Sequence, residues 1–149
     1  MNIKIVIRHD RSQIRVVCKI VRYLCILSDL ADHPALKNIE LAVVELLTNI
    51  IDHSNSGEDS EIKIHCLYSD ELFTIDVTDG GRPLSSEQVL AYTTDQISMP
   101  DIDGSTDSLP ESGWGIQLIK SACDRIVYRR QGQHNKYQLS FDLSAAVCD

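Results

Sequence analysis

The sequence has few aromatic residues, no long apolar run and more acidic than basic side chains. Aromatic residues make up 5% of the 149 residues, and no segment approaches the ~20 consecutive apolar residues of a membrane-spanning helix. Lys and Arg total 14 against 22 Asp and Glu, which gives a formal net charge of −8. Because nucleic-acid binding needs clustered cations, we expect no direct nucleic-acid contact. Because no apolar run is long enough to cross a bilayer, we expect no membrane location. The hydrophobic content of 43% is enough for a core.

Cysteines are scattered and odd in number, and no Cys-x-x-Cys pair occurs. The five are Cys18, Cys25, Cys66, Cys123 and Cys148. This arrangement excludes a disulfide framework or a zinc framework and indicates reduced thiols. The N-terminus has neither the basic nor the apolar region of a signal peptide. We therefore expect a cytoplasmic protein.

Hydrophobic periodicity predicts the elements of the first half of the chain. Alternation of Ile3, Ile5 and Ile7 predicts a strand. From Ser12, taken as the N-cap, the spacing changes to that of an amphipathic helix, and a second helix starts near Pro34 and stops before residue 54. Two strands follow at residues 61–68 and 72–78, joined by a hairpin turn at residues 69–71.

The second half contains a long polar segment between shorter elements. We expect a helix at residues 86–92, a helix at 113–123, and a hairpin of strands at 125–130 and 136–143. The polar segment 93–112 is too long for an ordinary loop and indicates a lid over a site. The pattern predicts one domain, 1–149, of α/β class: a two-layer α+β sandwich with helices on one face of a mixed, mainly antiparallel sheet.

The second predicted helix carries Glu45, Asn49 and His53 at intervals of four residues. Residues at this spacing share one face of a helix. A carboxylate and an amide oxygen side by side can provide a base and a ligand for a hard cation. The alternative is an ordinary solvated helix face.

An acid followed by two glycines, Asp79-Gly80-Gly81, ends the predicted strand 72–78. A carboxylate there can accept a hydrogen bond from the exocyclic amine of adenine, whereas guanine presents an acceptor at that edge. Gly81 has no Cβ, so the backbone could approach a flat base closely. The alternative is a hairpin turn, since Asp-Gly is a strong turn signal.

A pair of glycines, Gly113 and Gly115, flanks Trp114 at the start of the next predicted helix. Free amides at a helix N-terminus favour phosphate. The alternative is a flexible loop end, with Trp114 as a surface anchor or a core residue.

The order of these three motifs resembles the GHKL ATPase superfamily, and within it the anti-sigma-factor serine kinases of bacterial partner-switching systems. The segments that carry the resemblance are residues 42–54, 77–83 and 111–127. The Asp-x-Gly-x-Pro form at 79–83 favours the anti-sigma branch over the sensor histidine kinases. The resemblance implies a Bergerat-type ATP-binding fold that uses ATP and Mg²⁺.

Each site residue receives a role from this resemblance alone. Asn49 would bind Mg²⁺, Glu45 would act as the catalytic base, and Asp79 would read the adenine amine. Gly81 would lie beside the base, and the remaining cofactor-binding positions near the phosphates would be Gly113 and Gly115. The implied partners are a sigma factor, a serine-bearing anti-anti-sigma antagonist of STAS type, and a second copy of the chain. The apolar strand around Ile5 would otherwise be an exposed edge.

Three features depart from the family pattern. No Lys or Arg occurs between Arg82 and Lys120, a region that contains several acids. Gln117 lies where a third glycine would fall, and Lys136 takes the place of a Thr or Ser that helps to hold adenine in relatives. A nucleotide-binding regulatory module with little or no turnover therefore stays an alternative. A detached histidine-kinase catalytic domain ranks last.

Overall fold

The computed structural model describes residues 1–53, 60–94 and 114–144, which form one sheet with helices on one side. Its strands are β1 (Asn2–Arg8), β2 (Glu61–Ser69), β3 (Leu72–Asp79), β4 (Arg125–Gln131) and β5 (His134–Asp142). They lie in the order β1-β2-β3-β5-β4, and every neighbouring pair is antiparallel. The helices are α1 (Arg11–Leu27), α2 (Ala35–His53), α3 (Ser86–Thr93) and α4 (Trp114–Ala122).

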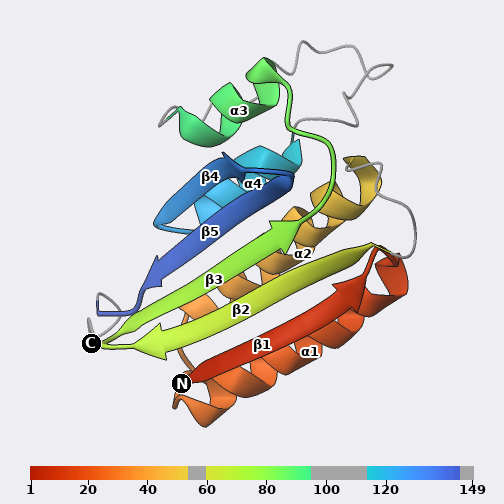
Figure 1. Cartoon of the computed structure of the whole chain (residues 1–149). Helices are drawn as coiled ribbons and strands as arrows, with labels where there is room; N and C mark the ends of the chain where they lie inside the picture. The colour runs from red at the N-terminus through yellow and green to blue at the C-terminus, as the bar shows by residue number, and fades with distance from the viewer. Residues whose placement is uncertain (54–59, 95–113, 145–149) are drawn as a thin grey trace, which may run out of the picture.

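The layers are visible in Figure 1, where α1, α2 and α4 lie behind the sheet and the face toward the viewer carries no helix. The predicted two-layer sandwich and all nine predicted elements are confirmed within the described residues. The sequence predicted a mixed, mainly antiparallel sheet, and within the described residues every strand pair is antiparallel. None of the described helices combines the length and the apolarity that crossing a bilayer demands.

Helix α1 begins two residues earlier than the Ser12 cap predicted. Asp10 is the N-cap, and its carboxylate accepts a hydrogen bond from the Ser12 backbone N–H at 2.8 Å. The Ser12 hydroxyl donates to the same carboxylate at 2.6 Å. The predicted N-cap was wrong because Asp caps as well as Ser, and here Asp stands first in the chain.

The β2–β3 hairpin has a two-residue turn, one residue shorter than predicted. Asp70 and Glu71 have φ of 51° and 64°. Positive φ at both central residues is the geometry of a type I′ turn, whose twist matches that of paired strands. Ser69 consequently pairs with Leu72 as part of the ladder.

The core lies between the inner face of the sheet and the helices. Helix α2 contributes seven buried residues, among them Ile39, Leu46 and Leu47. Phe73 on β3 and Phe141 on β5 meet them from the sheet at 2% exposure or less. Burial of each such side chain contributes about 1.5–3 kcal/mol. This packing fixes the rotation of α2 and therefore the direction of its polar residues.

The described cysteines, Cys18, Cys25, Cys66 and Cys123, are free thiols, as the sequence predicted. Burial raises the pKa of Cys66 to about 12 and that of Cys25 to about 11. Since the thiolate is the reactive form, these two are inert core residues. Cys148 lies outside the described residues.

Helix α3 is fixed at its start by a capping box. The Gln88 N–H donates to the Ser85 hydroxyl at 3.2 Å, and the Ser85 N–H donates to Gln88 Oε1 at 3.0 Å. This reciprocal pair satisfies two backbone donors at the helix N-terminus. The helix then ends with Tyr92 buried against the sheet.

Candidate functional site

Two of the three sequence motifs meet where α4 crosses α2. A Cβ added to Gly115 would lie 3.0 Å from Asn49 Oδ1, 3.1 Å from Asn49 Nδ2 and 3.2 Å from Glu45 Oε2. Only a residue without a side chain lets the α4 backbone come this close to both polar groups. Helix α4 therefore lies directly against the polar stripe of α2.

A cavity of about 360 Å³ opens beside this contact, between α2, α3, α4 and β5. Such a volume is within the range of small-molecule sites, roughly 300–1,000 Å³. Its lining includes Asn49, His53, Tyr92, Gly115, Gln117 and Tyr137. Glu45 is not part of the lining, but its carboxylate lies next to Gly115, which is part of it. His53, which had no assigned role, also faces this space.

Tyr92 holds the Asn49 side chain from α3. Burial raises the pKa of Tyr92 to about 12, and a hydrogen bond with Asn49 partly opposes that rise. The phenol is therefore protonated at neutral pH. Because an amide has both a donor nitrogen and an acceptor oxygen, its nitrogen can meet Tyr92 while its oxygen faces a cation.

Asp79, at the end of β3, is 1% exposed and carries an unused acceptor. Its Oδ1 accepts from the Gly81 N–H at 2.6 Å and from Asn135 Nδ2 at 3.5 Å. Its Oδ2 is buried and has no hydrogen-bond partner among the described residues. A buried carboxylate oxygen without a donor is unfavourable, so it fits an N–H supplied by a ligand.

The second motif lies outside the cavity lining, since neither Asp79 nor Gly81 is part of it. Tyr137, which does line it, connects the two regions. Burial raises the pKa of Tyr137, and the neighbouring Tyr92 and Asp79 raise it further. Tyr137 thus links the cavity to Asp79, and we call the region around Asp79 the floor of the site.

Asn135 is a site residue that the sequence analysis missed. It is 1% exposed and pairs with Asp79 in the β3–β5 register. Its Oδ1 accepts from Tyr128 Oη at 2.8 Å and from Arg130 Nη1 at 2.9 Å, while its Nδ2 donates to the Arg82 carbonyl at 2.8 Å. Arg130 also donates to the Gly81 carbonyl at 2.8 Å. This network fixes the backbone that follows Asp79.

Lys136 does not occupy the position that the sequence analysis gave it. The last strand begins at His134, two residues earlier than predicted, and therefore includes Asn135. Asn135 faces inward and Lys136 faces outward. The alternation of buried Asn135, Tyr137, Leu139 and Phe141 was the available signal. A polar residue in phase with three apolar ones marks a buried polar position.

The remaining predicted positions are divided between described and undescribed parts of the chain. Gly113 and the lid segment 95–112 lie outside the described residues. Trp114 opens α4 and is half-buried. Gln117 lines the cavity, and its Oε1 is buried without a hydrogen-bond partner among the described residues.

The donors present fit a metal that is bound mainly through a nucleotide. The described residues contain no group of three or more His, Cys, Asp or Glu side chains that could hold a metal alone. Mg²⁺ usually takes one or two oxygens from protein and the rest from phosphate and water. Asn49 and Glu45 offer adjacent oxygens of this type.

Comparison with known families decides how this geometry is interpreted. The sequence model of the histidine kinase-like ATPase domain matches residues 7–141. The chain belongs to the histidine kinase-like ATPase family. This membership implies ATP binding and confirms the resemblance to GHKL ATPases found in the sequence.

Two relatives narrow the position of this ATPase domain within the family. Serine-protein kinase RsbW of Halalkalibacterium halodurans is 32% identical over 94 residues, which are 61% of this chain and 53% of the relative. The solved RsbU and RsbW domains of Rv1364c from Mycobacterium tuberculosis superpose with a TM-score of 0.65 at 14% identity. That match covers 96% of this chain and 32% of the other, so the chain spans about half and about a third of these relatives.

Proposed function

We propose that this ATPase domain is an anti-sigma factor and protein-serine kinase of a cytoplasmic partner-switching system. It would bind a sigma factor and transfer the γ-phosphoryl group of ATP to a serine of a STAS-type anti-anti-sigma protein. The observation that carries the proposal is the contact of Gly115 with both Asn49 and Glu45. The relative named serine-protein kinase RsbW supports the reaction class.

The proposed roles follow from what phosphoryl transfer requires. Its transition state is loose, so the protein mainly positions groups and offsets charge. Asn49 would hold Mg²⁺ through Oδ1; the ion, when bound with the nucleotide, supplies that charge. Glu45 would orient the incoming serine hydroxyl and accept its proton late in the transfer. Its Oε2 lies next to Gly115 and Asn49, which supports this role.

The adenine would be read from the floor of the site. Asp79 Oδ2 is a buried acceptor without a donor among the described residues, which suits the exocyclic amine of adenine. Gly81 would lie beside the base, held by the hydrogen bonds from its N–H to Asp79 and from Arg130 to its carbonyl. Gly113 and Gly115 would approach the phosphates.

The kinase proposal is tested by phosphotransfer from labelled ATP to STAS-type antagonists of the same organism. We expect label on serine for the wild type. Glu45→Gln should abolish transfer while ATP still binds, and Asn49→Ala should remove the Mg²⁺-dependent part of ATP binding. Glu40→Gln, on the same helix and paired with Arg22, is the matched control and should keep transfer. Absence of transfer in the wild type, or unchanged transfer in Glu45→Gln, would contradict the proposal.

A second candidate is a regulatory module that binds nucleotide without turnover. Gln117 favours it, because its side chain projects into the cavity where relatives have glycine. In that case ATP binds, no serine is labelled, and Gln117→Gly restores transfer.

A homodimer is also proposed, through the free edge of β1. This strand pairs only with β2 among the described strands, and Val6 and Ile3 on it are 57% and 37% exposed. Natural proteins usually cover such an edge. Light scattering should give twice the chain mass of 16.7 kDa.

A further inference from the structure

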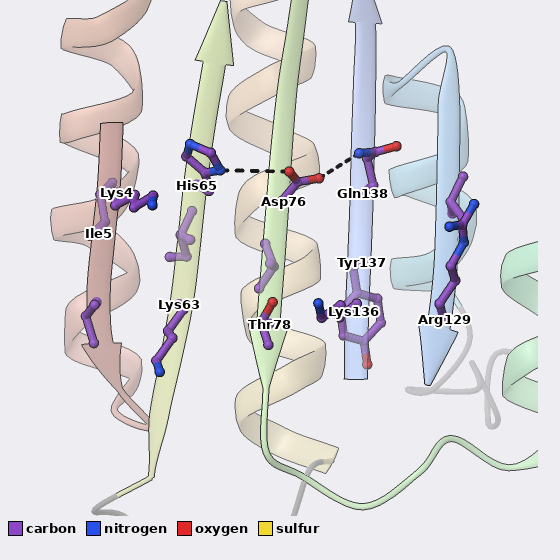
Figure 2. Close-up of a pocket in the computed structure, with 14 residues that line it drawn as sticks. Lys4, Ile5, Lys63, His65, Asp76, Thr78, Arg129, Lys136, Tyr137 and Gln138 are labelled. Atoms are coloured by element: carbon purple, nitrogen blue, oxygen red, sulfur yellow. Dashed lines mark hydrogen bonds and ion pairs between the residues drawn. The ribbon is translucent and has the colours of Figure 1, made fainter. Parts of the chain in front are cut away.

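The open face of the sheet carries a group of cations on a chain whose net charge is −8. Figure 2 shows Lys4 on β1, Lys63 on β2, Lys136 on β5 and Arg129 on β4, all on the side away from the helices. They border a shallow hollow of about 490 Å³. We call these four residues and the hollow the basic face.

Three of the four cations lie in one row across the sheet. Lys63 is opposite Thr78, Thr78 is opposite Lys136, and Lys136 is opposite Arg129. With strands about 4.8 Å apart, the row spans roughly 14 Å. Like charges directly opposite each other destabilise a strand pair. The Lys136–Arg129 pair therefore lowers the stability of the sheet, so a role in folding does not explain it.

Among the described residues, the acids near the basic face leave three of the four cations without an ion pair. Asp76 accepts from Gln138 Nε2 at 2.8 Å and lies 4.0 Å from His65. Glu61 lies 3.9 Å from Lys63, an exposed and therefore weak pair. Across the described residues, Lys4, Arg129 and Lys136 have no acidic partner within 4.0 Å.

We propose that the basic face docks an acidic segment of a partner protein, whose carboxylates match the row of cations. A second copy of this chain would bring the same cations into contact, which repels. Nucleic acid is disfavoured because single strands bind by stacking on aromatic rings. Tyr137 lines the hollow but is only 4% exposed, and Tyr68, Phe73, Tyr128 and Phe141 pack in or against the core. The proposal does not depend on the kinase function.

The site of the acidic segment is separate from the nucleotide cavity. The cavity is formed by helices and by the inward side of β5, whereas Lys4, Lys63, Lys136 and Arg129 project from the opposite side of the sheet. Charge changes on the basic face should therefore leave ATP binding intact. ATP-induced stabilisation thus reports that each variant is folded.

The test measures binding of a fluorescein-labelled peptide of ten glutamates by anisotropy at low salt. We expect wild-type binding that weakens as NaCl is raised, because salt screens exposed charges. Lys63→Glu combined with Lys136→Glu should weaken binding by about tenfold or more. Arg15→Glu combined with Lys19→Glu on α1 makes the same charge change at exposed positions and should leave binding within about twofold of the wild type.

A single variant separates a docking role from a structural one. Arg129→Glu turns the like-charge pair with Lys136 into an opposite-charge pair. We expect this variant to raise Tm by about 1–3 °C and to weaken binding of the peptide. A residue kept for stability would instead lower Tm when changed.

Four outcomes would overturn the proposal. In the first, the wild type does not bind the peptide at low salt. In the second, the Arg15→Glu, Lys19→Glu control loses as much binding as the Lys63→Glu, Lys136→Glu variant. A single-stranded RNA of equal charge binds more tightly than the peptide through the same lysines, which makes the face a nucleic-acid surface. The sheet variant changes the sedimentation coefficient of the free protein, which makes it a contact between copies.

Discussion

The two ends of the candidate site are built in different ways. At the end where α4 meets α2, the geometry depends on a missing side chain, because Gly115 leaves room for Asn49 and Glu45. At the floor, the geometry depends on polar contacts, because Asn135 connects Tyr128, Arg130 and the Arg82 carbonyl. The geometry at Gly115 should be disturbed when atoms are added there. The geometry around Asn135 should be disturbed when its hydrogen bonds are removed.

The largest effect is expected from Gly115→Ala. The new Cβ would lie 3.0–3.2 Å from three polar atoms of Asn49 and Glu45, so both side chains must move. Misplacement of reacting groups by about 1 Å can reduce catalysis about 100-fold. We expect phosphotransfer to fall by that factor, measured with labelled ATP. Gly80→Ala is the control, because a Cβ there meets nothing within 4 Å; equal losses in both variants would contradict the steric explanation.

A smaller effect, confined to the floor, is expected from Asp79→Asn. The amide keeps one oxygen for the Gly81 N–H but places a donor where Oδ2 now lies. The binding free energy of ATP should become less favourable by about 1–3 kcal/mol, which lowers its affinity roughly 10–100-fold. The affinity for GTP should rise relative to that for ATP. Calorimetric titration with ATP and GTP measures both. Asp76→Asn, on the outer face of the same strand, should change neither affinity, and an unchanged ATP:GTP ratio in Asp79→Asn would refute adenine reading by Asp79.

Asn135→Ala should act on stability and affinity together. It leaves the buried Tyr128 hydroxyl without its acceptor and removes a part-buried hydrogen bond of Arg130. We expect the free energy of unfolding to fall by about 2 kcal/mol and Tm by about 6 °C, with ATP affinity down about tenfold. Differential scanning calorimetry tests this against Gln138→Ala on the outer face. If Tm falls but ATP affinity does not, the network is structural only.

The smallest effect concerns pH and His9, whose pKa burial lowers below 6.5 while Asp79 partly opposes that shift. Because the unfolded chain takes up this proton first, stability contributed by neutral His9 is complete above pH 6.5 and decreases as pH falls below it. We expect Tm of the wild type to decline between pH 6.5 and 5 more steeply than Tm of His9→Gln. Parallel curves for the two proteins would show that His9 does not contribute.

Hydrophobic periodicity was sufficient to predict the elements, because each buries one face in the core. The stripe of Glu45, Asn49 and His53 could be read from helical spacing alone. The Asn135–Asp79 contact could not, since it depends on pairing between strands 56 residues apart in the sequence. The predicted start at residue 136 left Asn135 outside the last strand, so its neighbour Lys136, which faces the opposite side, was matched to the adenine-binding position instead.

The central claim, that the three motifs form one adenosine-nucleotide site, is tested most directly by the rise in Tm on adding Mg²⁺ and ATP. A ligand that binds only the native state must raise Tm. The account predicts a rise with ATP, a smaller one with GTP, and a reduced ATP-induced rise in both Asn49→Ala and Asp79→Asn but not in Gly80→Ala. An unchanged Tm in the wild type, or a full rise in both site variants, would contradict it.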